Sequence, residues 1–375
     1  MKYGKMGICH FRTAIILLLG WCWSMLNLYA AGADTNQIDT KTGKPTGEWI
    51  SYLNADMQPA KDKFDCKYYK VINYKDGLPD GAVKYYYKSD QIYFSSAMQS
   101  VNPDIPVDGE ITYYAETGKP DHQLTYKNGK MNGKVLYWDV EGNVIRDGVC
   151  KDGAPWGLWR EVYADGTKGQ GEFLNGNPEG EWNYYFPNGY KSGTGNWSEG
   201  KKNGQWVTYS QTGATLQSGW MKDNEKTGNW KEYRDDGGWS QGDYTAGVKT
   251  GDWSIYGADS VLVSRGPIKD EKEDGFWIYY FPDGKVKAQG TLHAGSMEGT
   301  WRITDENGQS GIGSYLNNLR TGMWKFYNAD GKVIEEGAYK DGKEDGSWIQ
   351  FDSSGTETGS VTFKDGVIED DGSED

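Results

Sequence analysis

Residues 322–345 read GMWKFYNADGKVIEEGAYKDGKED, and the same pattern starts again at Gly346-Ser347-Trp348. Its opening Gly-x-Trp-x-x-Tyr carries two aromatic residues, which favour a β-strand. Asp330-Gly331 suits a turn that needs a positive φ, and Val333 to Tyr339 has the composition of a returning strand. A second turn at Asp341-Gly342 leads into the next unit, so each unit is predicted to be a β-hairpin.

The unit recurs along nearly the whole chain. Its glycine occurs thirteen times, and from residue 109 onward each step is 23 or 24 residues. Two residues after this glycine, ten of the thirteen units have tryptophan, which excludes coincidence. In the regular part of the array, the tryptophans predicted to form the structural core are Trp159, Trp182, Trp206, Trp230, Trp253, Trp277, Trp301, Trp324 and Trp348.

A second aromatic position follows five residues after the glycine. Strand side chains alternate between the two faces of a sheet, so these residues and the tryptophans should lie on opposite faces unless a bulge intervenes. The tyrosines at this position form a candidate binding ladder, namely Tyr185, Tyr209, Tyr233, Tyr256, Tyr280 and Tyr327. A third apolar position, which includes Cys150 and Tyr244, lies seven residues before the next glycine and should pack over neighbouring strands.

The repeats predict an all-β fold, an elongated antiparallel β-meander of about thirteen hairpin repeats of 23–24 residues. The first two repeats are longer and repeats two to four lack the tryptophan, so residues 34–108 are predicted to be modified N-terminal repeats that cap the regular array at 109–366. Residues 367–375 form an acidic tail. In the ninth repeat Asp259-Ser260 replaces the glycine turn, which indicates either a bend or a docking point.

Residues 1–33 differ in kind from the repeats. A basic start, an apolar run from Ala14 to Leu28 and Ala31-Gly32-Ala33 before Asp34 predict a secretory signal peptide. The apolar run is shorter than the roughly 20 residues that span a bilayer, although an uncleaved anchor is the alternative. We therefore expect an exported chain, located in the periplasm, on the outer surface or in the medium.

Charge and cysteine content narrow the choice of partners. The formal net charge is −14, and loss of the three positive charges of the leader gives −14 − 3 = −17. Such a surface argues against nucleic acid and against an anionic membrane surface as partners. Cys66 and Cys150 remain after the leader, and they should not form a bridge because three repeats, roughly 29 Å in a continuous meander, separate them.

The recurring pattern G-x-[YWF]-x-x-G-x-x-x-G-x-W-x-x-Y, as in residues 242–256, resembles the MORN repeat and more closely its bacterial variant. The resemblance covers about residues 43–366 and implies an extended antiparallel meander. Tryptophan replaces the second glycine of the standard G-x-G, which weakens any transfer of phosphoinositide binding. Proteins with the variant repeat are commonly described as YwqK-family antitoxins or immunity proteins, a description that assigns no residues here.

Catalytic signals are weak. His122 and His293 lie in repeats three and eleven, roughly 77 Å apart in a meander, so they cannot share a metal ion or a triad. No nucleophile elbow, phosphate-binding loop or cysteine cluster is present in the sequence. We therefore predict no catalytic residue, no metal site and no cofactor. A hydrolase with paired carboxylates is the enzymatic alternative, but the acidic residues lie mainly in predicted turns.

The sequence thus predicts a non-enzymatic exported scaffold that binds a protein partner, such as a toxin to be neutralised. The alternative is a cell-envelope glycan-binding protein that uses exposed aromatic ladders. Aromatic ladders that are covered throughout would favour protein contacts, whereas a short row open to solvent would favour glycans. The identity of the partner and the oligomeric state stay open at this level.

Overall fold

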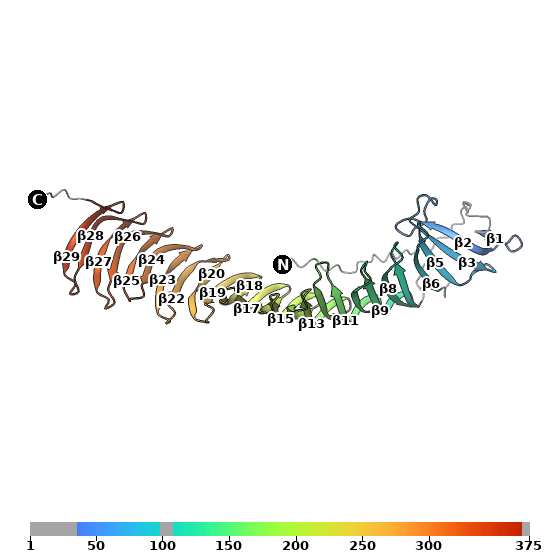
Figure 1. The fold of residues 1–375 in the computed structure, drawn as a ribbon, viewed down its shortest axis with the longest axis horizontal. Coiled ribbons are helices and arrows are strands. Elements are labelled where there is room, and N and C mark those ends of the chain that lie inside the picture. The colour runs from blue at the N-terminus through green and yellow to red at the C-terminus, as the bar shows by residue number, and fades with distance from the viewer. Residues whose placement is uncertain (1–35, 98–107, 370–375) are drawn as a thin grey trace. The chain divides into compact units, whose positions relative to one another are not determined.

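The computed structural model describes residues 36–97 and 108–369. All regular structure within these ranges is β-strand, and neighbouring strands pair antiparallel (Figure 1). These residues include no helix that could cross a membrane. The predicted leader at 1–33 and residues 370–375 of the acidic tail lie outside the described residues. The predicted all-β antiparallel meander is confirmed.

The chain divides into two units, Met1–Asp104 and Ile105–Asp375. The strands of the first unit are β1 (Gln37–Ile38), β2 (Pro45–Leu53), β3 (Tyr68–Lys75), β4 (Leu78–Pro79), β5 (Ala82–Tyr87) and β6 (Ile92–Ala97). Strands β1, β2, β3, β5 and β6 pair in this order, and β4 pairs with the end of β3. Leu53, Ile72, Val83 and Tyr85 are the buried centre of this unit.

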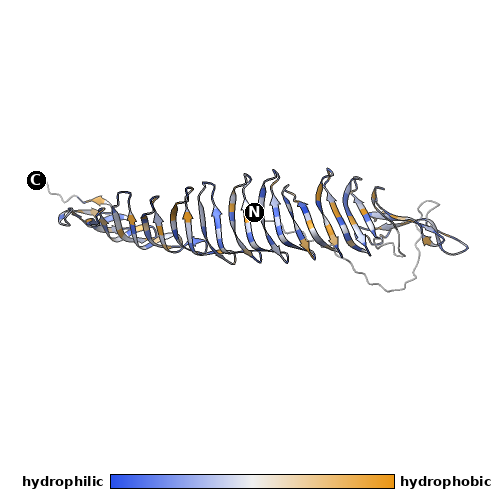
Figure 2. Ribbon diagram, turned by 90° about the horizontal axis from the view of Figure 1, so that it is seen from below, coloured by the Kyte–Doolittle hydropathy of each residue, from blue (hydrophilic) through white to orange (hydrophobic). Residues whose placement is uncertain are grey.

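The second unit is a row of hairpins. Its strands are β7 (Gly109–Tyr114), β8 (Pro120–Lys127), β9 (Lys130–Trp138), β10 (Val144–Lys151), β11 (Ala154–Val162), β12 (Lys168–Leu174), β13 (Asn177–Tyr185), β14 (Lys191–Ser198), β15 (Lys201–Tyr209), β16 (Thr215–Lys222), β17 (Glu225–Tyr233), β18 (Trp239–Thr245), β19 (Val248–Tyr256), β20 (Leu262–Lys269), β21 (Lys272–Glu273), β22 (Gly275–Tyr280), β23 (Val286–His293), β24 (Ser296–Thr304), β25 (Ser310–Leu316), β26 (Leu319–Tyr327), β27 (Val333–Lys340), β28 (Lys343–Phe351), β29 (Glu357–Lys364) and β30 (Val367–Ile368). Each strand pairs with its successor, except that β21 and β22 both pair with β20 and not with each other. Hydrophobic residues recur on successive strands instead of gathering at one centre (Figure 2).

Two kinds of turn lie on the two rims of this row. At one rim Gly166 N–H donates to Tyr163 O at 2.8 Å, and its φ is 77°. At the other rim Asp152 and Gly153 both have positive φ, of 52° and 91°, which defines a two-residue hairpin turn. Most turns of the second kind also bond to the previous repeat, as when Gly153 N–H donates to Met131 O at 2.8 Å. These bonds fix the spacing of the repeats.

The recurring glycine of Gly-x-Trp creates a bulge in each of the nine tryptophan strands of the regular array. All thirteen of these glycines have positive φ, between 59° and 130°, a region that side chains with a Cβ rarely adopt. Gly219 pairs with Trp230, but the next residue, Trp220, already pairs with Thr227. The forward strand therefore carries two extra residues at this point, which moves the tryptophan ring over the strand in front of it.

The irregular ninth repeat keeps the common turn geometry. Ser260 takes the place of the glycine with a φ of 62°, and its N–H donates to Gly257 O at 3.0 Å as a turn glycine does elsewhere. Strand β20 then continues the pairing through Ser264 with Tyr279 of β22. Whether this repeat bends or docks a partner stays a prediction.

Candidate binding surfaces

Each tryptophan of the predicted core lies on a glycine of the preceding strand. A Cβ atom added to any of these glycines would approach the indole ring to 2.2–2.5 Å, which no side chain can occupy. The nine tryptophans are only 0–4% exposed. We call their side of the sheet the tryptophan face. The glycines beneath the rings are Gly148, Gly171, Gly195, Gly219, Gly242, Gly266, Gly290, Gly313 and Gly337.

The same pairing of strands gives most of the indole N–H groups a hydrogen-bond acceptor. In eight of the nine tryptophans Nε1–H donates to the backbone carbonyl ten residues earlier, at 2.9–3.2 Å. That carbonyl follows the glycine beneath the ring. Trp253 is the exception, because its Nε1 is buried without a hydrogen-bond partner among the described residues. An equivalent glycine and an equivalent acceptor thus hold eight of the nine rings in one orientation.

A different combination of residues fills the early repeats. Ile72 and Leu124 occupy the position that glycine holds in the later repeats. On the next strands Val83 and Val135 stand in place of tryptophan. All four side chains are at most 5% exposed. Where the returning strand carries isoleucine or leucine, the next strand therefore contributes the smaller valine. Where the returning strand carries glycine, the next strand contributes tryptophan. This exchange explains why repeats two and four lack the tryptophan.

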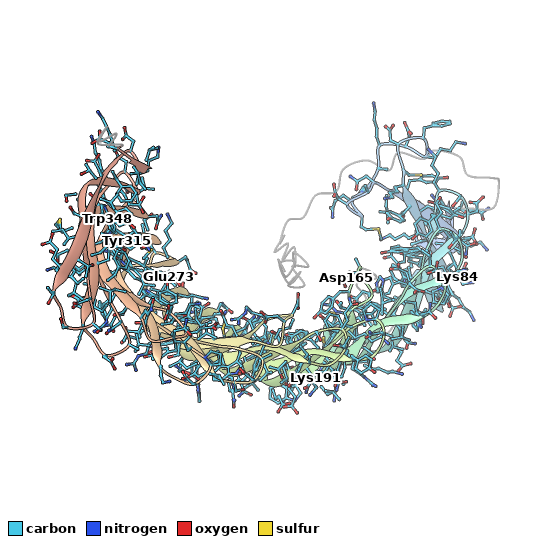
Figure 3. The ribbon with its side chains drawn as sticks, turned by 60° about the vertical axis from the view of Figure 1, so that its left-hand side comes forward. Lys84, Asp165, Lys191, Glu273, Tyr315 and Trp348 are labelled. Atoms are coloured by element: carbon cyan, nitrogen blue, oxygen red, sulfur yellow. The ribbon has the colours of Figure 1, made fainter. Side chains whose placement is uncertain are left out.

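The aromatic residues of the tryptophan face form an almost continuous chain of ring contacts. Tyr315 meets Trp324 at 5.3 Å and 86°, and Tyr339 meets Trp348 at 5.0 Å and 88°. Where the third apolar position is aromatic, these edge-to-face contacts place it between two tryptophans, as with Tyr339 between Trp324 and Trp348. Figure 3 labels Tyr315 and Trp348 among the side chains of this region. The faces of these rings are in contact with other side chains of the protein.

Cations lie within 4.5 Å of the ring centroids of four of the tryptophans. Lys202, Lys226, Lys249 and Arg320 each precede a tryptophan by four residues, and their charged ends lie 4.2–4.5 Å from its ring centroid. Burial lowers the pKa of Lys202. Contacts of this kind between a cation and an aromatic ring are attractive and add to the cover over the ladder. The sequence analysis did not assign these positions, because other repeats have proline, glutamate or methionine there.

One carboxylate joins two of these cations. Glu232 accepts bonds from Lys226 Nζ at 2.8 Å and Tyr244 OH at 2.6 Å, and it forms an ion pair with Lys249 Nζ at 2.8 Å. Burial alone would raise the pKa of Glu232, but the bonds from the two lysines and the tyrosine outweigh it and lower the pKa to about 2. Burial and Glu232 together raise the pKa of Tyr244. This network stabilises the array between two repeats.

A shallow hollow of about 420 Å³ lies where the row of cations is interrupted. Glu273 and Met297 occupy the places that lysine holds elsewhere, and Glu273 is labelled in Figure 3. Burial raises the pKa of Glu273, and Tyr279 OH donates to it at 3.4 Å. The full lining is Val263, Glu273, Tyr279, Tyr280, Lys287, Ala288, Leu292, Gly295, Met297 and Trp301.

The six tyrosines of the candidate binding ladder lie on the face opposite the tryptophans. Strand β17 pairs regularly with β18 from Trp230 to Tyr233, so the alternation between faces is unbroken. All six are half-buried. Residues of the returning strands stand between them, as Trp239 does between Tyr233 and Tyr256. The six are Tyr185, Tyr209, Tyr233, Tyr256, Tyr280 and Tyr327.

Trp239 is an aromatic residue of this face that the repeat pattern did not indicate. Its ring stacks on Tyr256 with centroids 3.8 Å apart and an angle of 13°. Lys231 Nζ lies 3.8 Å from its centroid, and its Nε1–H donates to Ser260 Oγ at 3.2 Å. The ring is thus held by neighbours from three strands and turns, and it is half-buried.

An exposed apolar patch lies on the tyrosine side of β10, β11 and β12. Val149 pairs with Trp156, and Leu158 precedes the buried Trp159 and so points to the opposite face. Leu174 lies beside Trp156, because Phe173 pairs with Gly157. The exposed fractions of Val149, Trp156, Leu158 and Leu174 are 44%, 36%, 57% and 43%. We call these four residues the apolar patch.

The histidines and cysteines have separate surroundings. His122 lies between Tyr113 and Tyr137, at ring distances of 4.3 and 5.3 Å, whereas His293 is exposed beside Asp274 at 3.1 Å. In the described ranges no group of histidine, cysteine and carboxylate residues could hold a metal ion. Cys66 and Cys150 are both buried as thiols, in agreement with the prediction that they do not form a bridge. Cys66 Sγ donates to Lys63 O at 3.1 Å.

Comparison with protein families identifies the repeat. The MORN repeat variant matches residues 107–128 and 320–341. These matches correspond to the β7–β8 hairpin and to most of the β26–β27 hairpin. The chain thus carries MORN repeat variants, as the resemblance implied. No curated protein sequence matches it.

Two solved structures show limited likeness to the chain. The Photorhabdus luminescens Tc holotoxin pore is 13% identical, with a TM-score of 0.15, over 88% of this chain and 20% of that one. The chain thus spans about a fifth of the length of that structure. A protein of unknown function from Bacteroides caccae is 8% identical, with a TM-score of 0.13, over 71% of this chain and 91% of that one.

Proposed function

We propose that the chain is an exported, non-enzymatic scaffold that binds a protein partner through the apolar patch, with a toxin to be neutralised as one class of partner. The presence of MORN repeat variants supports a repeat scaffold. The observation that favours this surface is the contrast between the two faces. Tryptophans that would be the best ligand platforms are 0–4% exposed, whereas Trp156 and Leu158 are 36% and 57% exposed on the other face.

The composition of the patch suits a protein more than a glycan. Clustered aliphatic side chains around one tryptophan resemble the centre of a protein interface, where a few buried anchors carry most of the binding energy. Lys151 Nζ lies 4.4 Å from the Trp156 ring and adds a charge at the rim of the patch. A glycan platform would need an open aromatic row, and the tryptophan ladder is covered by its own neighbours.

Affinity capture from a cell-envelope extract tests this function. The immobilised chain should retain one protein in stoichiometric amount, and the Trp156→Ala, Leu158→Asp variant should lose it. Trp220→Ala is the matched control, because Trp220 is 58% exposed on the same face but outside the patch. Surface changes of this kind should leave the thermal midpoint nearly unchanged, within about 0.5 kcal/mol of stability.

Three outcomes would contradict the proposal. Retention of the same protein by the patch variant would show that the contact lies elsewhere. Retention of polysaccharide instead of a protein would favour the glycan alternative. A chain found in the cytoplasmic fraction after cell fractionation would contradict export.

A further inference from the structure

The outer edge of β2 is closed by its own chain. Strand β1 pairs with Thr46 and Pro45, and Asn36 N–H donates to Glu48 O at 2.7 Å. The Asn36 side chain then bonds both backbone groups of Ile50, accepting at 2.6 Å and donating at 3.1 Å. The carbonyl of Tyr52 accepts from Ala60 N–H at 2.9 Å. Alternate residues along this edge, from Thr46 to Tyr52, thus have hydrogen-bond partners for outward backbone groups.

The outer edge of β29 is different. Strand β30 covers only its end, through Lys364 with Val367 and Phe363 with Ile368, and Glu369 N–H donates to Thr362 O. By alternation, Ser360 directs its backbone groups to the same side as Thr362 and Lys364. Thr358 is the extra residue of a bulge, because Gln350 pairs with Gly359 and Phe351 with Glu357. Among the described residues, no bond to the outward groups of Ser360 comes from β30 or Glu369. Between Thr358 and Phe363 the strand has no charge and no proline, which are the usual protections of a sheet edge.

The side chain at the centre of this edge breaks the rule of the array. Trp324 pairs with Gly337, and that glycine receives the ring of Trp348 on the next strand. Trp348 in turn pairs with Val361, which occupies the same position on β29. A valine there would collide with a further tryptophan. Leu124 of β8 is a large residue at the same position, and its partner on the next strand is Val135.

We propose that the open edge of β29 binds an extended strand of a protein partner, which pairs along residues 359–361, as β28 pairs with Glu335 and Glu336 of β27, and presents an aliphatic, β-branched side chain to Val361. The outward N–H and C=O of Ser360 supply hydrogen bonds, and the side chain opposite Val361 supplies selectivity. Addition of a strand to an exposed edge is a general mode of peptide recognition. This site is separate from the apolar patch and does not depend on it.

A second copy of the chain fits this edge poorly. Pairing of β29 with the closed edge of β2 is blocked by β1 and Asn36. Two β29 strands centred on Gly359 would meet at the bulge that Thr358 forms in each of them, which interrupts a regular ladder.

Two peptides that copy strands of this chain test the proposal. Fluorescein-labelled Lys130–Trp138 carries Val135 at the position in question, and the matched control Glu225–Tyr233 carries Trp230. In fluorescence anisotropy with the full chain, the valine peptide should bind at least about tenfold more tightly, since overpacking costs roughly 1–3 kcal/mol. Val361→Gly should reverse this preference, because glycine then admits the tryptophan ring.

A proline variant separates edge pairing from nonspecific binding. Ser360→Pro removes a backbone N–H that points away from β28, so the hydrogen bonds between β28 and β29 are kept. Proline is tolerated on the open side of an edge strand. It should abolish binding of the valine peptide, while Ser360→Asn should retain it. Circular dichroism should show the same β-sheet content for all these variants.

Several results would overturn the proposal. One is equal binding of both peptides with no change in Val361→Gly. Another is binding that persists in Ser360→Pro, and a third is no binding of either peptide at millimolar concentration. Sedimentation that shows a dimer of the chain, lost in Ser360→Pro, would assign the edge to a second copy instead of a partner strand.

Discussion

Two solutions to the same packing problem occur in this molecule. Where the returning strand carries Ile72 or Leu124, the next strand contributes Val83 or Val135. From β10 to β27 the returning strand carries glycine and the next strand contributes tryptophan, as with Gly219 and Trp230. Both solutions bury the contributing side chain, to 2% exposure for Val135 and Trp230 alike. The difference lies in which strand supplies the volume.

This difference affects how firmly neighbouring repeats are joined. An indole that crosses onto the previous strand adds a hydrogen bond to a backbone carbonyl, as from Trp230 to Trp220 O at 2.9 Å, which valine cannot make. The ring also receives cover from Lys226 and edge contact from Tyr244. The glycine and tryptophan repeats are therefore expected to depend on single side chains more strongly than the leucine and valine repeats do.

The largest effect is expected from truncation of a central ring. Trp230→Ala should lower the free energy of unfolding by about 3–5 kcal/mol, because it removes a fully buried ring and leaves a cavity above Gly219. Val135→Ala should cost less, about 2 kcal/mol, since only two methyl groups are lost. Urea denaturation followed by circular dichroism measures both. Equal losses would show that the two kinds of repeat are equally dependent on the contributing strand.

The opposite change tests the glycine. Gly219→Ala places a Cβ at 2.3 Å from the Trp230 ring and should cost about 2 kcal/mol by overpacking. Gly359→Ala is the matched control, because a Cβ at that strand glycine meets nothing within 4 Å. It should be neutral or slightly stabilising in the same urea titration. A neutral Gly219→Ala would mean that the ring moves aside easily, and the proposed selectivity of Val361 would weaken with it.

The sequence specified the repeat and much of its local structure. Dipeptides such as Asp152-Gly153 indicated the turns, and positions two and five after the glycine indicated the two faces. The glycine beneath each ring was visible in the pattern at Gly242, but its role was not. That role depends on a two-residue register shift between strands, which composition and spacing do not encode. The apolar patch escaped notice because Trp156 and Leu158 belong to no recurring position.

A double-mutant cycle can convert one kind of repeat into the other. Val135→Trp alone should destabilise the chain, since the ring would meet Leu124. In combination with Leu124→Gly the ring gains the space that it has elsewhere, so the double variant should be more stable than the sum of the single effects by about 1–2 kcal/mol. Denaturant midpoints of the four proteins give this coupling energy. Strict additivity would show that the exchange of volumes is not local to this pair of strands.

The smallest effect concerns the charges that cover the central rings, a feature that the valine repeats lack. The pKa of Glu232 is about 2 in the folded chain, below the value of about 4.3 for an unperturbed glutamate. A lowered pKa stabilises the folded state above the unfolded pKa, and this contribution is lost as pH falls from about 5 toward 2. Glu232→Gln should therefore cost about 1–2 kcal/mol at pH 7, allowing for partial screening of the half-buried network, and almost nothing at pH 2. Glu336→Gln is the control, because its partner Lys325 is largely exposed and solvent screens the pair at 2.7 Å, so this change should cost much less than Glu232→Gln. If the Glu232 variant lost the same stability at both pH values, the effect would arise from packing instead of charge, and the cations would have to be regarded as cover for the rings alone.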